Sequence, residues 1–381
     1  MQKEKTMNNI ESYIEMLMNK STPDYPAWNI EAIRQGKKST WNYIDGCMIK
    51  AILEMYAITG EKKYFDFAES FVSAKVDENG NIAGYSVDEL NIDNVNAGKT
   101  LFELYDLTGK EKYRKAIDLI YSQLEKMPRT KGGNFWHKNI YPNQVWLDGM
   151  YMGQPFYMEY DTRFGGKEHY DDIANQFINV IRIMRNPLNG LYFHAYDESR
   201  EMFWCDKVTG LSQNSWLRAI GWYSMALLDT YEKADPEESD IRELLADAFE
   251  DLIRAMLNYQ DESGMWYQVV NFPGMEKNYL ETSGSSIMAY AILKGVRLGL
   301  LPEDFRVYGE KAFDGVTQNK LSFDENNELH LDGICLVAGL GGANNRPGTY
   351  DYYMSEPIVK DDAKGVGPYL LAYTEIKRIR G

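Results

Sequence analysis

The feature that most constrains the fold is a segment that repeats within the chain. Residues 53–64 (LEMYAITGEKKY) and residues 102–113 (FELYDLTGKEKY) agree at six of twelve positions, at an offset of 49 residues. A degenerate third copy is found at residues 165–170 (GGKEHY). Each copy predicts a helix that ends at a glycine, a short charged turn and a second helix. A repeat that encodes a helical pair indicates an array or ring of hairpins.

The rest of the chain continues this pattern. Further helix pairs are expected at 216–231 with 241–256 and at 285–298 with 302–316. The last helix, Val366–Arg378, has no partner after it, and a helix near Asn8–Met18 would supply one by closing the ring. We therefore expect about twelve helices in six pairs, forming one toroidal domain over residues 1–381. The alternative is an open α-solenoid, which would need a more uniform period and no closing helices.

A second repeat lies between the hairpins. Residues 133–137 (GNFWH), 190–194 (GLYFH) and 264–268 (GMWYQ) share a pattern of glycine, any residue, two aromatics and His or Gln. Equivalent loops of a ring of hairpins lie at the same end of the ring. These loops are therefore expected to line one mouth with aromatic rings and imidazoles.

Composition excludes several classes of partner. Lys and Arg number 41 and Asp and Glu number 57, which gives a net charge of −16 that repels nucleic acid and anionic membranes. No apolar run reaches the ~18 residues of a membrane span, and the N-terminus has no apolar signal core. The three cysteines, Cys47, Cys205 and Cys335, are far apart, as expected of free thiols in a reducing compartment. We therefore expect a cytoplasmic protein.

Catalytic and cofactor motifs of the common enzyme classes are missing. The sequence contains no HExxH, GxSxG, P-loop or GxGxxG pattern, and its cysteines do not form a metal knuckle. Zinc peptidase, serine hydrolase, nucleotidase and dinucleotide-binding functions therefore lose their usual support. Aromatic residues make up 13% of the chain, which favours a surface that stacks on ring-shaped ligands.

Two aspartates stand at similar places, each at the entry to an expected inner helix. Asp148 follows Trp146 and Leu147, and Asp93 lies in the segment NIDNVNAG. Either carboxylate could cap its helix. Alternatively, the two could meet in the mouth as a pair, in which one charge raises the pKa of the other carboxyl group, as a general acid requires.

Candidate ligand-binding residues surround these aspartates. Arg218 and Trp222 are four residues apart on one helix face, as a site for an acidic sugar would require, although Arg218 could instead extend along a core-facing helix. Tyr43 opens the first inner helix, and the position of His194 in the second repeated loop favours the mouth over the core.

Four segments together resemble family 105 of the glycoside hydrolases, the unsaturated rhamnogalacturonyl hydrolases. They are WHKNIYPNQVWLDGMYMG (136–153), FHAYDE (193–198), WLRAIGWY (216–223) and DNVNAG (93–98). The resemblance implies an all-α fold, an (α/α)6 barrel of six helical hairpins, and no cofactor. It also implies that Asp148 is the proton donor and Asp93 its partner carboxylate. The substrate-binding positions that it implies are Asn42, Tyr43, His137, Lys138, Met152, His194, Trp216, Arg218, Trp222, Ala338 and Gly339.

The resemblance also implies a reaction. The expected substrate is the 4,5-unsaturated galacturonyl residue that pectin lyases leave at the non-reducing end, usually linked to rhamnose. Asp148 would protonate C4, water would add at C5, and the resulting hemiketal would open and break the glycosidic bond. One departure concerns Ala338-Gly339, where a branch of the family has Thr-Ser, so that backbone N–H groups would have to replace the lost hydroxyl contacts.

Other functions remain open at this point. One is an unsaturated glucuronyl hydrolase that acts on glycosaminoglycan or algal fragments, and another is a sugar-binding barrel without catalysis. An epimerase on a similar barrel would use histidine pairs, for which a chain with four histidines leaves little room. The expected partner is an unsaturated oligosaccharide, with neither nucleic acid nor membrane, and the expected state is a monomer or homodimer.

Overall fold

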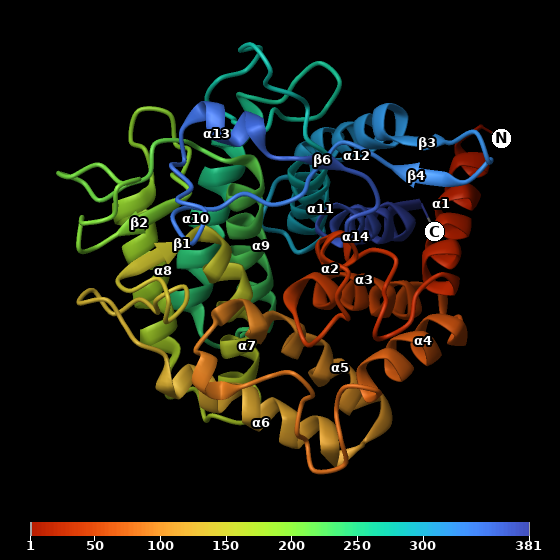
Figure 1. The fold of residues 1–381 in the computed structure, drawn as a ribbon, viewed down its shortest axis with the longest axis horizontal. Coiled ribbons are helices and arrows are strands. Elements are labelled where there is room, and N and C mark those ends of the chain that lie inside the picture. Colours follow the sequence, from red (N-terminus) through yellow and green to blue (C-terminus); the bar gives the residue numbers. More distant parts are fainter. Residues whose placement is uncertain (1, 381) are drawn as a thin grey trace.

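A ring of helices closes on itself in the computed structural model, which describes residues 2–380, with side chains from Asn9 onward. Residues 1 and 381 of the expected domain lie outside this range. Six inner segments pack each against the next around the ring, and the last packs against the first (Figure 1). In chain order they are α3 (Tyr43–Thr59), the 3-10 turn η2 (Ile92–Gly98) with α5 (Lys99–Thr108), α7 (Leu147–Arg163), α9 (Leu217–Lys233), α11 (Thr282–Arg297) and α14 (Ala363–Arg380).

A second layer of helices surrounds this ring. Its members are α4 (Lys62–Ser73), α6 (Glu111–Lys126), α8 (Tyr170–Met184), α10 (Ser239–Leu257), α12 (Arg306–Lys320) and α1 (Gln2–Asn19). The first five each pack on the inner helix that precedes them. The N-terminal helix α1 completes the sixth pair with α14, since Glu11 accepts hydrogen bonds from Tyr373 and Lys377. The predicted all-α (α/α)6 barrel is therefore confirmed.

The repeated sequence corresponds to repeated helix ends. Gly60 ends α3 and Gly109 ends α5, with φ of 67° and 65°, and each N–H donates to the carbonyl oxygen four residues earlier at 2.8 Å. This left-handed conformation is open to glycine at little steric cost. The degenerate third copy lacks such an ending, because α7 ends at Arg163 before Gly165 and Gly166.

Inner and outer helices differ in how they are buried. In α9 every residue from Leu217 to Thr230 is buried, as expected for a helix enclosed on all sides. In the outer helix α8, Ile173, Phe177, Val180 and Met184 form one buried face. The hydrophobic core therefore lies both inside the ring and between its two layers.

Short strands and turns connect the hairpins. Three antiparallel strand pairs are formed by β1 (Gln144–Trp146) with β2 (Ala195–Asp197), β3 (Leu321–Phe323) with β4 (Leu329–Leu331), and β5 (Ile334–Cys335) with β6 (Ile358–Val359). In the first pair, Trp146 lies opposite Ala195, which ties the entry of α7 to the loop that contains His194. The short helices α2 (Ile30–Gln35) and α13 (Tyr350–Ser355) and the 3-10 turns at Val87–Glu89 and Glu303–Phe305 complete the described chain.

Two expectations about the whole chain can be compared with the structure. Within residues 2–380, no helix combines the length and the apolar character that crossing a membrane requires. Cys47, Cys205 and Cys335 are buried free thiols, as their spacing predicted.

Candidate active site

The three repeated loops cap the starts of inner segments. Each loop begins at a glycine with positive φ: 102° at Gly133, 75° at Gly190 and 90° at Gly264. The carbonyl oxygen of the fifth loop residue then accepts the N–H of the first residue of the preceding inner segment, which would otherwise lack a partner. These hydrogen bonds are Ile92 to His137 (3.2 Å), Leu147 to His194 (3.1 Å) and Leu217 to Gln268 (3.0 Å).

This arrangement creates two equivalent aspartate–histidine pairs. Asp93 and Asp148 are each the second residue of an inner segment, so each lies beside the last residue of a capping loop. His137 Nε2 is 3.5 Å from Asp93 Oδ1, and His194 Nε2 is 3.2 Å from Asp148 Oδ2. The common backbone register explains why two histidines and two aspartates, far apart in the sequence, meet at one end of the ring.

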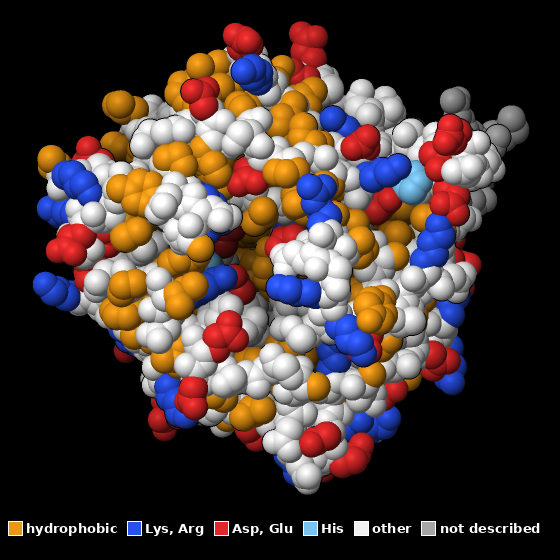
Figure 2. Space-filling model, viewed as in Figure 1, with side chains coloured by type: hydrophobic (Ala, Val, Ile, Leu, Met, Phe, Trp, Pro, Cys, Tyr) orange, Lys and Arg blue, Asp and Glu red, His pale blue; other side chains and the backbone are white. Residues whose placement is uncertain are grey.

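Both aspartates open onto one cavity of about 150 Å³. The face shown in Figure 2 is hollowed near its centre, over the inner helices. The wall contains acidic, basic and aromatic side chains from both ends of the chain. The lining residues are Glu31, Tyr43, Asp93, His137, Lys138, Tyr141, Trp146, Asp148, Met152, Val337, Ala338 and Arg346.

Asp93 is held as an anion. Lys138 Nζ lies 2.6 Å from Asp93 Oδ2, in a pair that is mostly buried. Burial would raise the pKa of Asp93, but the positive charge of Lys138, together with His137, lowers it below its ordinary value. Asp93 is therefore ionised at neutral pH.

Asp148 has a different environment. Within the described chain, no Lys or Arg lies at ion-pair distance from its carboxylate, whose side chain is 15% exposed. Its Oδ2 faces His194 without a hydrogen bond of normal geometry, while His194 Nδ1 is hydrogen-bonded to the Tyr353 hydroxyl (2.7 Å). The two carboxylates thus share a cavity but differ in charge compensation.

Neither aspartate caps a helix. The residue that precedes α7 is Trp146, and no side chain accepts a capping hydrogen bond there. At η2 the cap is Asn91, whose side chain accepts the N–H of Asp93. The capping alternative is therefore excluded for both carboxylates.

A stack of flat rings forms one wall of the cavity. His137 and Trp146 lie parallel, with ring centroids 4.6 Å apart, and Tyr141 continues the stack 5.2 Å from Trp146. Such a wall excludes water from the neighbouring carboxylates and presents apolar surface to a sugar.

Burial lowers the pKa of His137 to about 4, so that its imidazole is neutral at neutral pH. In the unfolded chain the pKa of this histidine is the ordinary 6.5 of an exposed imidazole. Because the unfolded state then binds more protons than the folded state, we expect stability to fall as the pH decreases from 6.5 to about 4, by about 3 kcal/mol in total.

Denaturant unfolding at several pH values tests this expectation. The variant His137→Gln should show a flatter pH dependence than the wild-type chain between these limits. The half-buried His169, which pairs with Asp161, provides a comparison in His169→Gln, whose pH dependence should differ from that of His137→Gln. An unchanged slope in His137→Gln would exclude His137 as the source.

The predicted site residues fall into two groups. Tyr43, Asp93, His137, Lys138, Asp148, Met152 and Ala338 line the cavity, and His194 lies directly behind Asp148. Trp216 supports His194, with ring centroids 4.8 Å apart. Gly339 follows Ala338, and its N–H donates to the Tyr352 hydroxyl.

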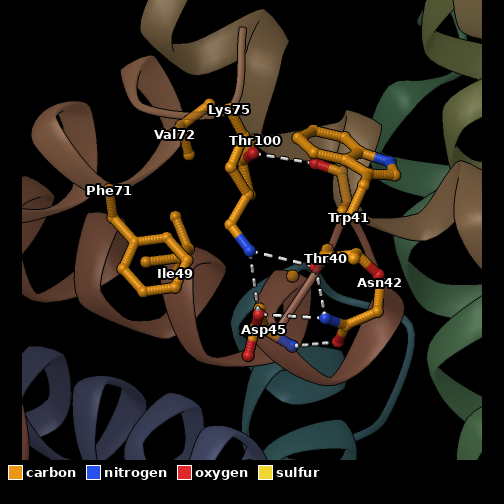
Figure 3. A pocket seen from close by; sticks show the side chains of 11 residues that line it. Thr40, Trp41, Asn42, Asp45, Ile49, Phe71, Val72, Lys75 and Thr100 are labelled. Atoms are coloured by element: carbon orange, nitrogen blue, oxygen red, sulfur yellow. Dashed lines mark hydrogen bonds and ion pairs between the residues drawn. The ribbon is translucent and has the colours of Figure 1, made fainter. Parts of the chain in front are cut away.

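Three predicted residues are engaged elsewhere. Asn42 caps α3: its side chain accepts the N–H of Asp45 and donates to the Asp45 carboxylate, beside Lys75 (Figure 3). Asn42 also lines a small separate pocket of about 20 Å³, together with Trp41.

Arg218 and Trp222 also lie outside the lining of the large cavity. The buried Arg218 guanidinium donates to the Cys335 carbonyl oxygen, and Trp222 stacks on Tyr151 with ring centroids 5.0 Å apart. Arg218 lies over the ring of Trp216, with its Cζ atom 4.7 Å from the ring centroid. Because α9 is buried on all sides, two residues on the same face of this helix can contact a neighbouring helix instead of a cavity.

Sequence reasoning missed five lining residues: Glu31, Tyr141, Trp146, Val337 and Arg346. Tyr141 and Trp146 stand within the segment that carries the family resemblance, so their aromatic character was an available signal. Arg346 is the one cation in the glycine-rich segment 339–348, which could have marked it. We find no local signal for Glu31.

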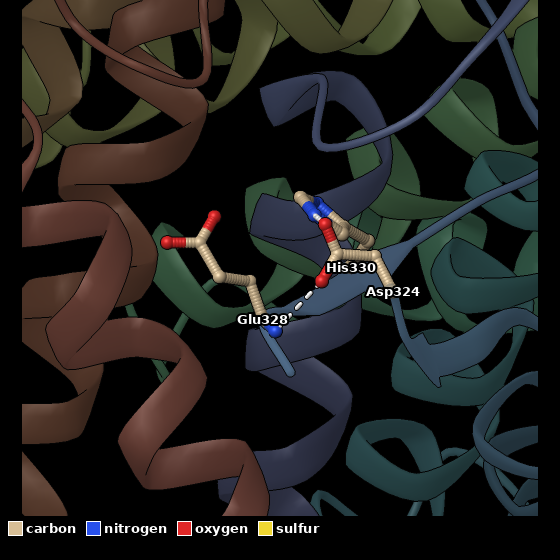
Figure 4. Close-up of side chains that lie close together, drawn as sticks. All are labelled: Asp324, Glu328 and His330. Carbon is tan, nitrogen blue, oxygen red and sulfur yellow. Dashed lines mark hydrogen bonds and ion pairs between the residues drawn. The ribbon is translucent and has the colours of Figure 1, made fainter. Parts of the chain in front are cut away.

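One group of side chains outside the cavity has a composition suited to a cation. Asp324, Glu328 and His330 approach one another on the β3–β4 hairpin (Figure 4). Each already has a partner: Asp324 accepts the N–H of Glu328, Glu328 pairs with Lys20, and His330 binds Asp361. All three side chains are therefore engaged in contacts that belong to the structure of the hairpin and its surroundings.

Comparisons with known proteins agree with the architecture. The chain matches the family model described as Glycosyl Hydrolase Family 88 over residues 13–380. It is similar to a solved glycoside hydrolase from family 105 of C. acetobutylicum ATCC 824, with 43% identity and a TM-score of 0.87 over 91% of this chain and 97% of that chain.

Two curated relatives extend the comparison. Protein Atu3128 of Agrobacterium fabrum is 41% identical over 230 residues, which cover 59% of this chain and 97% of that protein. The unsaturated rhamnogalacturonyl hydrolase YesR of Bacillus subtilis is 24% identical over 264 residues, which cover 68% of this chain and 72% of that protein.

Proposed function

This chain belongs to the glycosyl hydrolases of families 88 and 105, and on that premise we propose that it removes a 4,5-unsaturated galacturonyl residue from the non-reducing end of oligosaccharides. The observation that carries the proposal is the unequal pair of carboxylates in one cavity. Asp93 is compensated by Lys138, whereas Asp148 has no Lys or Arg partner within the described chain and faces His194. A reaction that needs one proton donor and one fixed anion suits this pair.

The substrate is an enol ether, and its reaction begins with a proton. Asp148 donates a proton to C4, and the resulting positive charge is shared between C5 and the ring oxygen. Water then adds at C5 and returns a proton to the Asp148 carboxylate. The hemiketal opens to a ketone, the bond to the next sugar breaks, and the aspartic acid is ready for another cycle.

Asp93 acts in this scheme through its charge. Because Lys138 keeps it ionised, Asp93 presents a permanent anion to the cavity in which positive charge develops. A preorganised anion stabilises such a transition state without first having to lose a proton. His137 lies beside this anion and is neutral at neutral pH, so that the positive charge next to Asp93 comes from Lys138.

Other lining residues position the sugar. The stacked rings of Trp146 and Tyr141 offer a flat surface for it. Tyr43, whose pKa is raised far above its ordinary value by burial and by nearby carboxylates, stays protonated and can donate a hydrogen bond. The choice of rhamnose as the neighbouring sugar is supported by the likeness to YesR.

A comparison of two substrates tests the proposal. The enzyme should consume unsaturated galacturonyl-rhamnose faster than an unsaturated chondroitin disaccharide, in which the same unsaturated ring is joined through a different glycosidic linkage to a different leaving sugar. Loss of the ultraviolet absorbance of the conjugated double bond measures both reactions. Preference for the chondroitin disaccharide would favour a glucuronyl hydrolase, and binding without turnover of either substrate would indicate a sugar-binding barrel.

A further inference from the structure

A glycine-rich loop holds one arginine at the cavity. Arg346 lines the cavity, and it is held by neutral acceptors: its Nε donates to the Gly341 carbonyl oxygen (3.1 Å) and its Nη2 to the Tyr141 hydroxyl (3.2 Å). Tyr141 belongs to the stacked wall next to Trp146. The guanidinium is therefore fixed at the edge of the surface on which a sugar would lie.

The glycines of the loop leave space that the guanidinium fills in front of Gly339 and that it shares with Tyr141 in front of Gly342. A Cβ atom placed on Gly339 would lie 2.4 Å from Arg346 Nη1 and 2.6 Å from its Cζ. A Cβ atom on Gly342 would lie 3.0 Å from the Tyr141 hydroxyl and 3.4 Å from Arg346 Nη2. The absence of side chains at both glycines thus permits this position of the arginine.

The same contact bears on the Ala338-Gly339 departure. Backbone N–H groups were expected to replace hydroxyls there, but the Gly339 N–H is already donated to the Tyr352 hydroxyl. The guanidinium of Arg346 occupies the space in front of Gly339 instead. A cation therefore stands where the family resemblance led us to expect polar neutral contacts.

The ion pairs at the cavity do not include this cation. Lys138 pairs with Asp93, and Glu31 pairs with Lys364 at 2.7 Å. Within the described chain, no carboxylate lies at ion-pair distance from Arg346, which is only partly exposed. An arginine that is held by neutral acceptors keeps its remaining N–H groups available for an anion, and its planar fork suits a carboxylate.

We propose that Arg346 is a specificity-determining residue that binds a carboxylate of the oligosaccharide. The proposal rests on the proposed function, because it assumes that an acidic sugar enters this cavity. Two sources share the chemistry: the carboxylate of the unsaturated residue itself, and that of an acidic sugar attached to it. Gly339 and Gly342 act as positioning residues by leaving room for the guanidinium.

Two substrates with the same unsaturated residue distinguish these sources. One carries neutral rhamnose as the leaving sugar, and the other carries galacturonate. If Arg346 binds the leaving sugar, Arg346→Ala should lower kcat/KM about 10- to 100-fold for the galacturonate substrate alone, as for a lost charge-assisted hydrogen bond. If it binds the unsaturated residue, both substrates should be affected. Unchanged values for both would overturn the proposal.

Further variants separate binding from folding. Arg346→Lys keeps the charge without the fork and should retain part of the effect, while Arg306→Ala removes an arginine on the outer helix α12 and should leave both substrates unaffected. Gly339→Ala should reduce kcat/KM in the wild-type chain but add little in Arg346→Ala, because the displaced group is then already absent. Additive effects of these two changes would contradict the role of Gly339 in positioning Arg346.

A binding readout keeps this test independent of turnover. Calorimetric titration of Asp148→Asn and of Asp148→Asn/Arg346→Gln with unsaturated digalacturonate should show weaker binding in the double variant. Failure of the wild-type enzyme to hydrolyse any unsaturated uronide would defeat the proposed function, whereas equal affinities in this titration would defeat the assignment of Arg346.

Discussion

Replacement of Asp148 by asparagine should reduce turnover about 10²- to 10⁴-fold, the effect of losing a general acid. An asparagine has the shape of the aspartate but has no acidic proton to give to C4. The fold should tolerate the change, because Asp148 does not cap α7 and its Oδ2 makes no hydrogen bond within the described chain. Steady-state kinetics and a thermal unfolding curve measure the two parts of this prediction.

A second aspartate on the same helix provides a matched control. Asp161 is also paired with a histidine: its Oδ1 lies 2.9 Å from His169 Nδ1, and its Oδ2 accepts the N–H of the same residue. Asp161 is fully buried and lies outside the cavity lining, so Asp161→Asn should lower stability and leave turnover near that of the wild type. Near-normal turnover in folded Asp148→Asn would remove Asp148 from the proposed mechanism.

The fold was predictable because its signals are local. Gly60 and Gly109 each end an inner helix through the same hydrogen bond, and such an ending depends on a few neighbouring residues. Asp93 and Asp148 could also be found, since both stand at a fixed distance from a helix start. The capping loops then place a histidine beside each of them, by a backbone register that the repeat itself encodes.

The rest of the site depends on contacts across the ring. Arg346 reaches Tyr141 over a separation of 205 residues, and no periodicity within either segment specifies that contact. Spacing placed Arg218 and Trp222 on one face of a helix, but α9 is buried on all sides, so spacing alone could not tell which neighbour each side chain meets. The sequence indicated which types of residue the site contains. The direction in which each side chain points depends on how the helices pack in the barrel.

Removal of Lys138 should have the second large effect, through the state of Asp93. In the wild-type chain the pKa of Asp93 lies below its value in the unfolded state, so the pair stabilises the fold above about pH 3.9 and this contribution is lost as the pH falls through the folded pKa. In Lys138→Met the charge that lowers this pKa is gone, and burial then raises the pKa of Asp93. The pH dependence of folding stability should therefore reverse its sign in this variant. Stability should decrease as the pH rises, because Asp93 then ionises without a partner.

The magnitude follows from leaving one buried charge uncompensated. The side chains of Asp93 and Lys138 are 12% and 23% exposed, so each single removal should destabilise the fold by about 3–5 kcal/mol at neutral pH. The double variant Asp93→Asn/Lys138→Met should lose less than the sum of the single variants, because neither unpaired charge remains. Urea unfolding of the four proteins between acidic and neutral pH measures this coupling. Strictly additive losses would show that the pair does not set the charge of Asp93, and the role of Asp93 as a permanent anion would then lose its physical basis.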